Sequence, residues 1–176
     1  MEKILYMTAL FLFFSCGQRN ESGKNFNQTN FEKESTNKTV TNSNSDNKPI
    51  DIALKFINSY VEDCNKMNKS MGYIMFVNSS SFTTENFKNE LKKIVDNAER
   101  EDPEMGLGIN PLIPGNDHPD EGFEFESFDR KTNLIVVKGK KWADFKVTIK
   151  MIFIDNKWLV DGCGMVNIPN DKRVAR

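Results

Sequence analysis

The sequence predicts an α+β domain in which two to three N-terminal helices pack on a curved antiparallel sheet of about four strands. Apolar residues recur at three- and four-residue steps in two segments between residues 50 and 99. In the second half of the chain they alternate with polar residues instead, as in strands that have one buried face. Residues 49–170 have the length of one domain with one core, about 120 residues.

The helical part begins with a segment expected to be a helix over about residues 50–66. A second helix is expected from Thr84, a suitable N-cap, to about residue 99. Residues 71–77 form an apolar run between them, and its period does not decide between helix and strand. The apolar faces of the two helices are formed by Ala53, Leu54, Phe56, Ile57, Tyr60, Val61 and Cys64, and by Phe87, Leu91, Ile94, Val95 and Ala98.

The sheet follows a long loop, residues 101–121, which holds four of the six prolines. Four strands are expected, at about 123–128, 134–138, 143–153 and 158–166. Asp155-Asn156-Lys157 is a turn signal between the last two. Because alternating strands leave only one face apolar, the helices must cover that face. The opposite face carries Lys146, Thr148 and Lys150 and is expected to contact water.

The first fifteen residues have the form of a secretory signal. A charged start is followed by the apolar run 4–14, which is too short to span a bilayer, and then by the small residue Ser15. Cys16 comes next, where bacterial lipoproteins are cut and their new N-terminal thiol receives a diacylglyceryl group. We therefore expect residues 1–15 to be removed and Cys16 to be lipidated. An ordinary cleaved signal with a chance cysteine, or an N-terminal membrane anchor, is the alternative.

Residues 16–48 are expected to be a disordered stalk that starts at the lipidated Cys16. Positions 17–48 include eight Asn and eight Ser or Thr, and such a composition buries too little apolar surface to offset the entropy of ordering. A flexible chain of this length spans about 30 Å. A segment that folds on contact with a partner is the alternative. Few acids follow Cys16, which favours the outer membrane facing the periplasm, with surface exposure left open. Residues 171–176 are expected to be a disordered tail.

Several segments resemble one superfamily. They are Phe56–Tyr60, Phe82–Phe87, Asp102-Pro103, Asn110–Asp117 and Ile152–Gly162. With the order helix, helix, long loop and strands, they resemble the cone-shaped fold of nuclear transport factors and ketosteroid isomerases over about residues 50–168. More narrowly, they resemble bacterial, often lipid-anchored, domains of unknown function in that superfamily. The resemblance implies a concave sheet with a pocket or a partner-binding face, and it implies no particular reaction.

Two cysteines, Cys64 and Cys163, remain after lipidation of Cys16. In an oxidising compartment the pair could form a disulfide, which would contribute about 4–5 kcal/mol by closing a loop of about 100 residues. The alternative is two separate thiols that behave as small apolar residues. The sequence leaves both alternatives open.

The chemistry of the polar residues gives little sign of catalysis. His118 is the single histidine and has no spaced partner, so we expect no metal site and no cofactor. An isomerase or hydratase would need a carboxylate facing the apolar side of the sheet, with a donor such as Tyr60. No strand acid clearly faces that side, so no catalytic residue is assigned. With 24 cations, 25 anions and no basic stripe, the chain is not expected to bind nucleic acid.

Binding is therefore the expected role. The candidate surface comprises Tyr60, Asp102, Asp117, His118 and Trp142. Trp142 follows two lysines at an expected turn, which makes it the aromatic residue expected to be exposed, and loops on a rigid scaffold often bind partners. The sequence predicts a lipid-anchored envelope protein that binds a protein partner or a small ligand, as an immunity or inhibitor protein does. The alternatives are a pocket enzyme of the isomerase–hydratase type and an envelope accessory protein without a discrete ligand.

Overall fold

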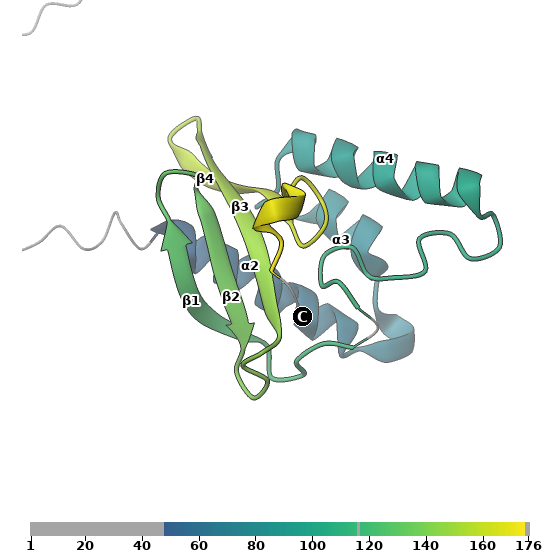
Figure 1. Cartoon of the computed structure of the whole chain (residues 1–176), viewed down its shortest axis with the longest axis horizontal. Coiled ribbons are helices and arrows are strands. Elements are labelled where there is room, and N and C mark those ends of the chain that lie inside the picture. Colours follow the sequence, from purple (N-terminus) through teal and green to yellow (C-terminus); the bar gives the residue numbers. More distant parts are fainter. Residues whose placement is uncertain (1–47, 116, 175–176) are drawn as a thin grey trace, which may run out of the picture. The chain divides into compact units, whose positions relative to one another are not determined.

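A computed structural model describes residues 48–115 and 117–174, and these form three α-helices and a four-stranded antiparallel sheet (Figure 1). The sheet order β1-β2-β3-β4 follows the chain, and the predicted α+β class is confirmed. The elements are α2 (Lys48–Cys64), η1 (Met67–Lys69), α3 (Gly72–Ser79), α4 (Glu85–Glu101), β1 (Phe123–Asp129), β2 (Leu134–Gly139), β3 (Lys146–Ile154), β4 (Lys157–Cys163) and η2 (Asn170–Lys172).

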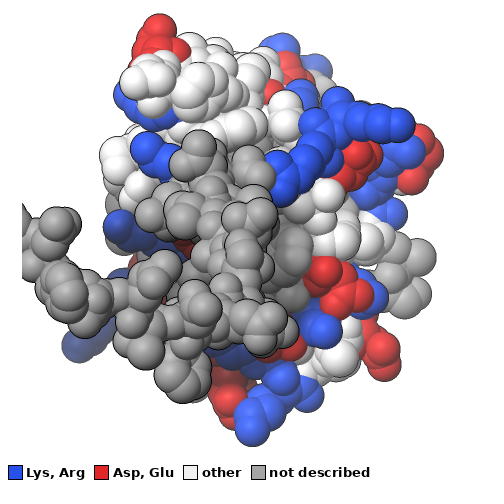
Figure 2. All heavy atoms as spheres, turned by 90° about the vertical axis from the view of Figure 1, so that its left-hand side faces the viewer, with Lys and Arg blue, Asp and Glu red and all other residues white. Residues whose placement is uncertain are grey.

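The predicted signal peptide, Cys16 and the stalk as far as residue 47 lie outside the described residues. Among the residues that are described, no helix is long and apolar enough to cross a membrane. On the face that Figure 2 shows, acidic and basic side chains are interspersed.

Helix α2 fills the inner face of the sheet. Its apolar stripe places Phe56, Ile57 and Tyr60 in the core, each at most 2% exposed. Asn58 fixes the helix against the first strand: its Nδ2 donates to the Phe123 carbonyl at 3.1 Å, and its Oδ1 accepts from the Phe123 amide at 2.7 Å. The inner face of the sheet, which the resemblance implied to be a concave pocket or partner-binding face, is therefore packed with helix side chains.

The apolar run at 71–77, which the sequence left undecided, is part of helix α3. Helix α4 begins where it was predicted to begin, because the Thr84 hydroxyl caps it by accepting from the Phe87 amide at 3.0 Å. The segment before the cap extends the sheet: the Thr84 amide donates to the Val160 carbonyl at 3.0 Å, and the Val160 amide donates to the Phe82 carbonyl at 2.7 Å. Helix α4 is thus joined directly to the edge of β4.

The β3–β4 hairpin closes with a two-residue turn, Asp155-Asn156, as the sequence predicted. Both residues have positive φ, 50° and 61°, the backbone of the two-residue turns whose twist matches that of the strands. Lys150 is the last residue of β3 that pairs with β2, so the rest of the hairpin extends beyond the first two strands. Strand β3 begins at Lys146 and not at residue 143, because Phe145 closes a turn by donating its amide to the Trp142 carbonyl at 2.9 Å.

The outer face of the sheet is partly covered by residues 164–173, which we call the C-terminal strap (Figure 1). Thr148, expected to contact water, is only 2% exposed because its hydroxyl donates to the Lys172 carbonyl at 2.9 Å. Arg173 holds the strap together by donating from Nε to the Ile168 carbonyl and from Nη2 to the Met165 carbonyl. Residues 172 and 173, which belong to the predicted tail, thus make contacts within the strap and with β3. Residues 175 and 176 lie outside the description.

Candidate binding site

Three of the five residues predicted to form a binding surface lie around one open hollow of about 400 Å³. Asp117 and His118 come from the loop before β1, and Trp142 comes from the turn between β2 and β3. We call this site the acidic hollow. Its lining consists of Asp117, His118, Pro119, Asp120, Glu121, Lys141 and Trp142.

The loop side of the acidic hollow is held by the end of α2. His118 Nε2 lies 2.9 Å from Asn65 Oδ1, and Asn65 Nδ2 donates to the Asp120 carbonyl at 3.0 Å. The loop also approaches the β2–β3 turn closely, since a Cβ added to Gly139 would lie 2.7 Å from Pro119 Cγ. A larger residue at position 139 would separate the two walls of the acidic hollow.

Trp142 forms the aromatic wall of the acidic hollow and is 45% exposed, although Phe153, at 52%, is more exposed. The Trp142 ring meets the buried Phe145 ring edge to face, with centroids 5.0 Å apart. The core therefore supports one part of the indole ring while the rest remains open. An aromatic side chain fixed in this way can contact a partner at little cost in conformational entropy.

The rim of the acidic hollow carries more negative than positive charge. Asp117, Asp120 and Glu121 face a single lysine, Lys141, whose Nζ lies 4.0 Å from a Glu121 oxygen. His118 Nε2 lies 3.8 Å from Asp120 Oδ1. Acids beside an exposed indole suit a cationic group, which the carboxylates and the ring face both attract. Within residues 48–115 and 117–174, no group of three or more acidic, cysteine or histidine side chains is arranged to hold a metal ion.

Tyr60 and Asp102 do not belong to this site. Tyr60 is 2% exposed, and its hydroxyl accepts a hydrogen bond from Asn110 Nδ2 at 2.8 Å. Burial is the largest of the effects that raise the pKa of Tyr60 well above its usual range, so the residue is part of the core and not of a binding surface. Asp102 caps the start of the long loop by accepting from the amides of Glu104 and Met105 at 3.1 and 3.0 Å.

Both remaining cysteines are free thiols in the structure, which corresponds to the second of the two alternatives that the sequence left open. Cys163 is fully buried, and its Sγ donates to the Leu112 carbonyl at 3.4 Å. Burial is the main cause of the raised pKa of each thiol, so both stay protonated at neutral pH. They act as small core residues in this state of the protein.

Asp161, a buried acid on β4, is not among the residues that the sequence singled out. Its carboxylate accepts from Thr84 Oγ1 at 2.7 Å, Asn86 Nδ2 at 3.2 Å and Asn167 Nδ2 at 2.9 Å, and it pairs with Lys150 Nζ at 3.1 Å. Burial alone would raise the pKa of Asp161, but the hydrogen bonds and Lys150 outweigh burial and lower it. The sequence feature that could have revealed Asp161 is its position as the single acid in an otherwise uncharged strand segment, 158–163.

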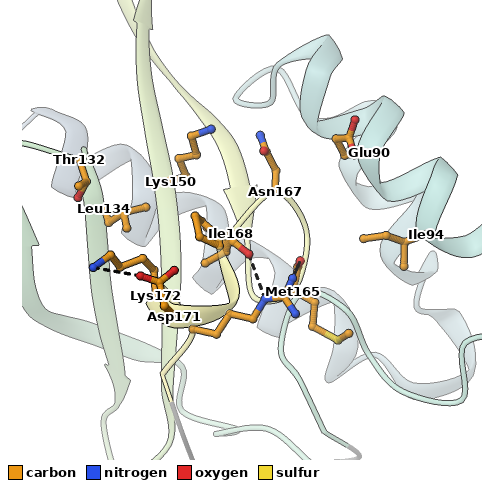
Figure 3. Close-up of a pocket in the computed structure, with 12 residues that line it drawn as sticks. Glu90, Ile94, Thr132, Leu134, Lys150, Met165, Asn167, Ile168, Asp171 and Lys172 are labelled. Atoms are coloured by element: carbon orange, nitrogen blue, oxygen red, sulfur yellow. Dashed lines mark hydrogen bonds and ion pairs between the residues drawn. The ribbon is translucent and has the colours of Figure 1, made fainter.

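A larger hollow of about 620 Å³ lies between α4, the outer face of the sheet and the C-terminal strap (Figure 3). The cations that line it already have partners: Lys150 pairs with Asp161, Lys172 Nζ lies 3.4 Å from Asp171, and Arg173 donates to two strap carbonyls. Lys150 thus pairs within the sheet, and Lys172 and Arg173 pair within the strap. The acidic hollow, with its exposed aromatic wall and its excess of acids, is the better candidate for binding.

Comparison with known proteins finds no match, either among family models or among curated proteins and solved structures. The predicted resemblance to the cone-shaped superfamily therefore stays a prediction, and the candidate site rests on the geometry of this chain.

Proposed function

We propose that this chain is a lipid-anchored protein of the bacterial envelope whose domain binds a protein partner or a small ligand without catalysis. The main support for a binding role is that Asp117, His118 and the exposed Trp142 line one open hollow. The anchor is the acylated Cys16, which would hold the domain at the outer membrane on its periplasmic side. The signal-like segment before Cys16 supports this location.

A binding role fits the arrangement of polar groups better than an isomerase or hydratase does. Such an enzyme needs a base and an oxyanion donor that face one substrate pocket. Here the Tyr60 hydroxyl is buried and occupied by Asn110, while Asp161 is ion-paired with Lys150. The two groups therefore offer no shared substrate site.

The chemistry of the acidic hollow favours a cationic contact. A lysine or arginine side chain of a protein partner would meet Asp120 and Glu121 while it lies against the Trp142 ring. An immunity or inhibitor protein that recognises a basic surface on an incoming toxin would use such a site. An accessory protein without a ligand would need no such site.

Photocrosslinking in the native host tests the binding role. With a benzophenone amino acid at position 142, we expect one discrete adduct, whose mass identifies a protein or a small ligand. The same amino acid at position 92, on the exposed face of α4, is the control and should give none of that adduct. Because rim charges steer association, Asp120→Lys should reduce the adduct and Asp96→Lys, on α4, should not. Identical products from positions 142 and 92, or no product from position 142, would contradict the proposal.

A further inference from the structure

The tip of the β3–β4 hairpin exposes apolar side chains beyond the rest of the sheet. Phe153 is 52% exposed and Ile154 is 40% exposed. The Phe153 ring lies against the partly buried Trp158 ring, with centroids 5.3 Å apart. Lys150 is the last β3 residue that pairs with β2, so neither β1 nor β2 covers this tip. The pair of rings stabilises the hairpin, but that contact leaves the exposed parts of Phe153 and Ile154 without cover.

The tip lies on the side of the domain where α2 begins. In Figure 1 the hairpin tip and the start of α2 at Lys48 are both on the left. Figure 2 looks at that side, and its upper end, where the hairpin lies, is a largely uncharged surface with charged side chains at the margins. The acidic hollow lies at the other end of β3, whose nine residues span about 30 Å.

We propose that the hairpin tip inserts into the headgroup region of a phospholipid bilayer and so orients the domain with the acidic hollow facing away from the membrane. This inference rests on the proposed anchor at Cys16. A flexible stalk of residues 17–47 would keep the domain within about 30 Å of the lipid, so that even a weak contact of the tip with the bilayer would be occupied. Tryptophan is enriched at membrane interfaces, and phenylalanine is among the apolar residues that interfacial segments bury in the bilayer. A second membrane contact strengthens the attachment that a lipid anchor provides.

A second exposed apolar surface of the domain is an alternative to the hairpin tip as the membrane contact. It consists of the exposed side chains of Met67 on η1, Met71 at the N-cap of α3, and Ile74 and Met75 on α3. Because η1 follows the C-terminal end of α2, this surface lies at the opposite end of that helix from Lys48 (Figure 1). A tip that contacts lipid leaves the methionine surface free, whereas a domain that rests on its methionines keeps the tip in water.

The two tryptophans of the chain allow a direct test, since they lie near opposite ends of β3. Full-length protein is isolated from its membrane and reconstituted in phosphatidylcholine–phosphatidylglycerol vesicles, with and without bromine on the acyl chains. Tryptophan fluorescence comes from Trp158 alone in the variant Trp142→Phe, and from Trp142 alone in Trp158→Phe. We expect brominated lipid to reduce the fluorescence of Trp158 by about twofold or more and to leave the fluorescence of Trp142 unchanged.

Two further variants test whether the hairpin tip makes the contact with lipid. In the Trp142→Phe background, Phe153→Ser should remove most of the quenching of Trp158, and Met75→Ser should not change it. Equal quenching of both tryptophans, or no quenching of Trp158, would overturn the proposal. An oligomer that Phe153→Ser dissociates, with Trp158 unquenched, would show that a second copy covers the tip and would overturn it too. The mass of the N-terminal peptide from the same sample reports acylation of Cys16 separately, so a failure of the anchor is distinguished from a failure of the tip.

Discussion

Replacing Asp161 with alanine is expected to lower the free energy of unfolding by about 2–4 kcal/mol. The carboxylate joins three parts of the fold: the N-cap of α4 through Thr84, the strap through Asn167 and the sheet through Lys150. Removing it takes the carboxylate acceptor away from three side-chain donors, Thr84, Asn86 and Asn167, and from the partly exposed Lys150 ammonium. Urea unfolding monitored by circular dichroism measures the change.

Asp96→Ala is the matched control for Asp161→Ala. Asp96 also pairs with a lysine, Lys92, at 2.6 Å, but both side chains are exposed on α4. Exposed ion pairs contribute little, so this variant should lose no more than about 0.5 kcal/mol. Equal losses in the two variants would contradict the role that we assign to Asp161.

The contribution of Asp161 should also depend on pH in a defined direction. Its pKa is lower in the folded protein than in the unfolded chain, where an Asp carboxyl has a pKa of about 3.9. The unfolded state therefore binds the proton first as pH falls, and the stabilisation present above that value is lost as pH falls through the folded pKa. The difference in stability between the wild type and Asp161→Ala should be constant near neutral pH and should shrink below about pH 4–5. A difference that grows on acidification would contradict this assignment.

Replacing Gly164 with alanine is expected to cost about 3 kcal/mol or more. Gly164 has φ +62°, and an added Cβ would collide with the carbonyl oxygens of Pro111 and Leu112. The backbone cannot easily move away, because the Gly164 amide donates to the Thr148 carbonyl at 3.0 Å and the Met165 amide donates to the Pro111 carbonyl at 2.8 Å. Thermal unfolding should show a large drop in the melting temperature.

Gly108 provides a matched control for this substitution. It has the same φ of +62°, but an added Cβ would meet nothing within 4 Å. Gly108→Ala therefore isolates the cost of the left-handed backbone, about 1–2 kcal/mol. The excess cost of Gly164→Ala over Gly108→Ala measures the collision with the loop, and the absence of any excess would contradict the packing described above.

Local signals in the sequence predicted the elements that local physics determines. Thr84 begins α4 because its hydroxyl can accept from the Phe87 amide, and Asp155-Asn156 closes a hairpin because both residues tolerate positive φ. Residues 71–77 were left undecided because a run that is apolar on all sides has no helical or strand period. The C-terminal strap was missed because long-range contacts order it: Thr148, which it covers, lies 24 residues before its partner Lys172.

The candidate site was predictable only in part. Asp117 and His118 were placed in a polar loop and Trp142 at an exposed turn, but nothing in the sequence indicated that Pro119 and Gly139 would bring the two segments together. Tyr60 was a poor choice for a surface, since its own helical period places it with Phe56 and Ile57 on the buried face. Asp161 was overlooked because the register shifts between Lys150 and Met151, next to its position on β4, and alternation alone does not reveal such a shift.

The proposed location rests on Cys16, and the mass of the mature N-terminus tests it most directly. We predict that protein from the native host begins at Cys16, that its N-terminal peptide carries a diacylglyceryl group on the thiol, and that Cys16→Ala releases the domain from the membrane fraction. A chain that still begins at Met1, with an unmodified thiol at position 16, would contradict the proposed anchor and the membrane orientation that depends on it.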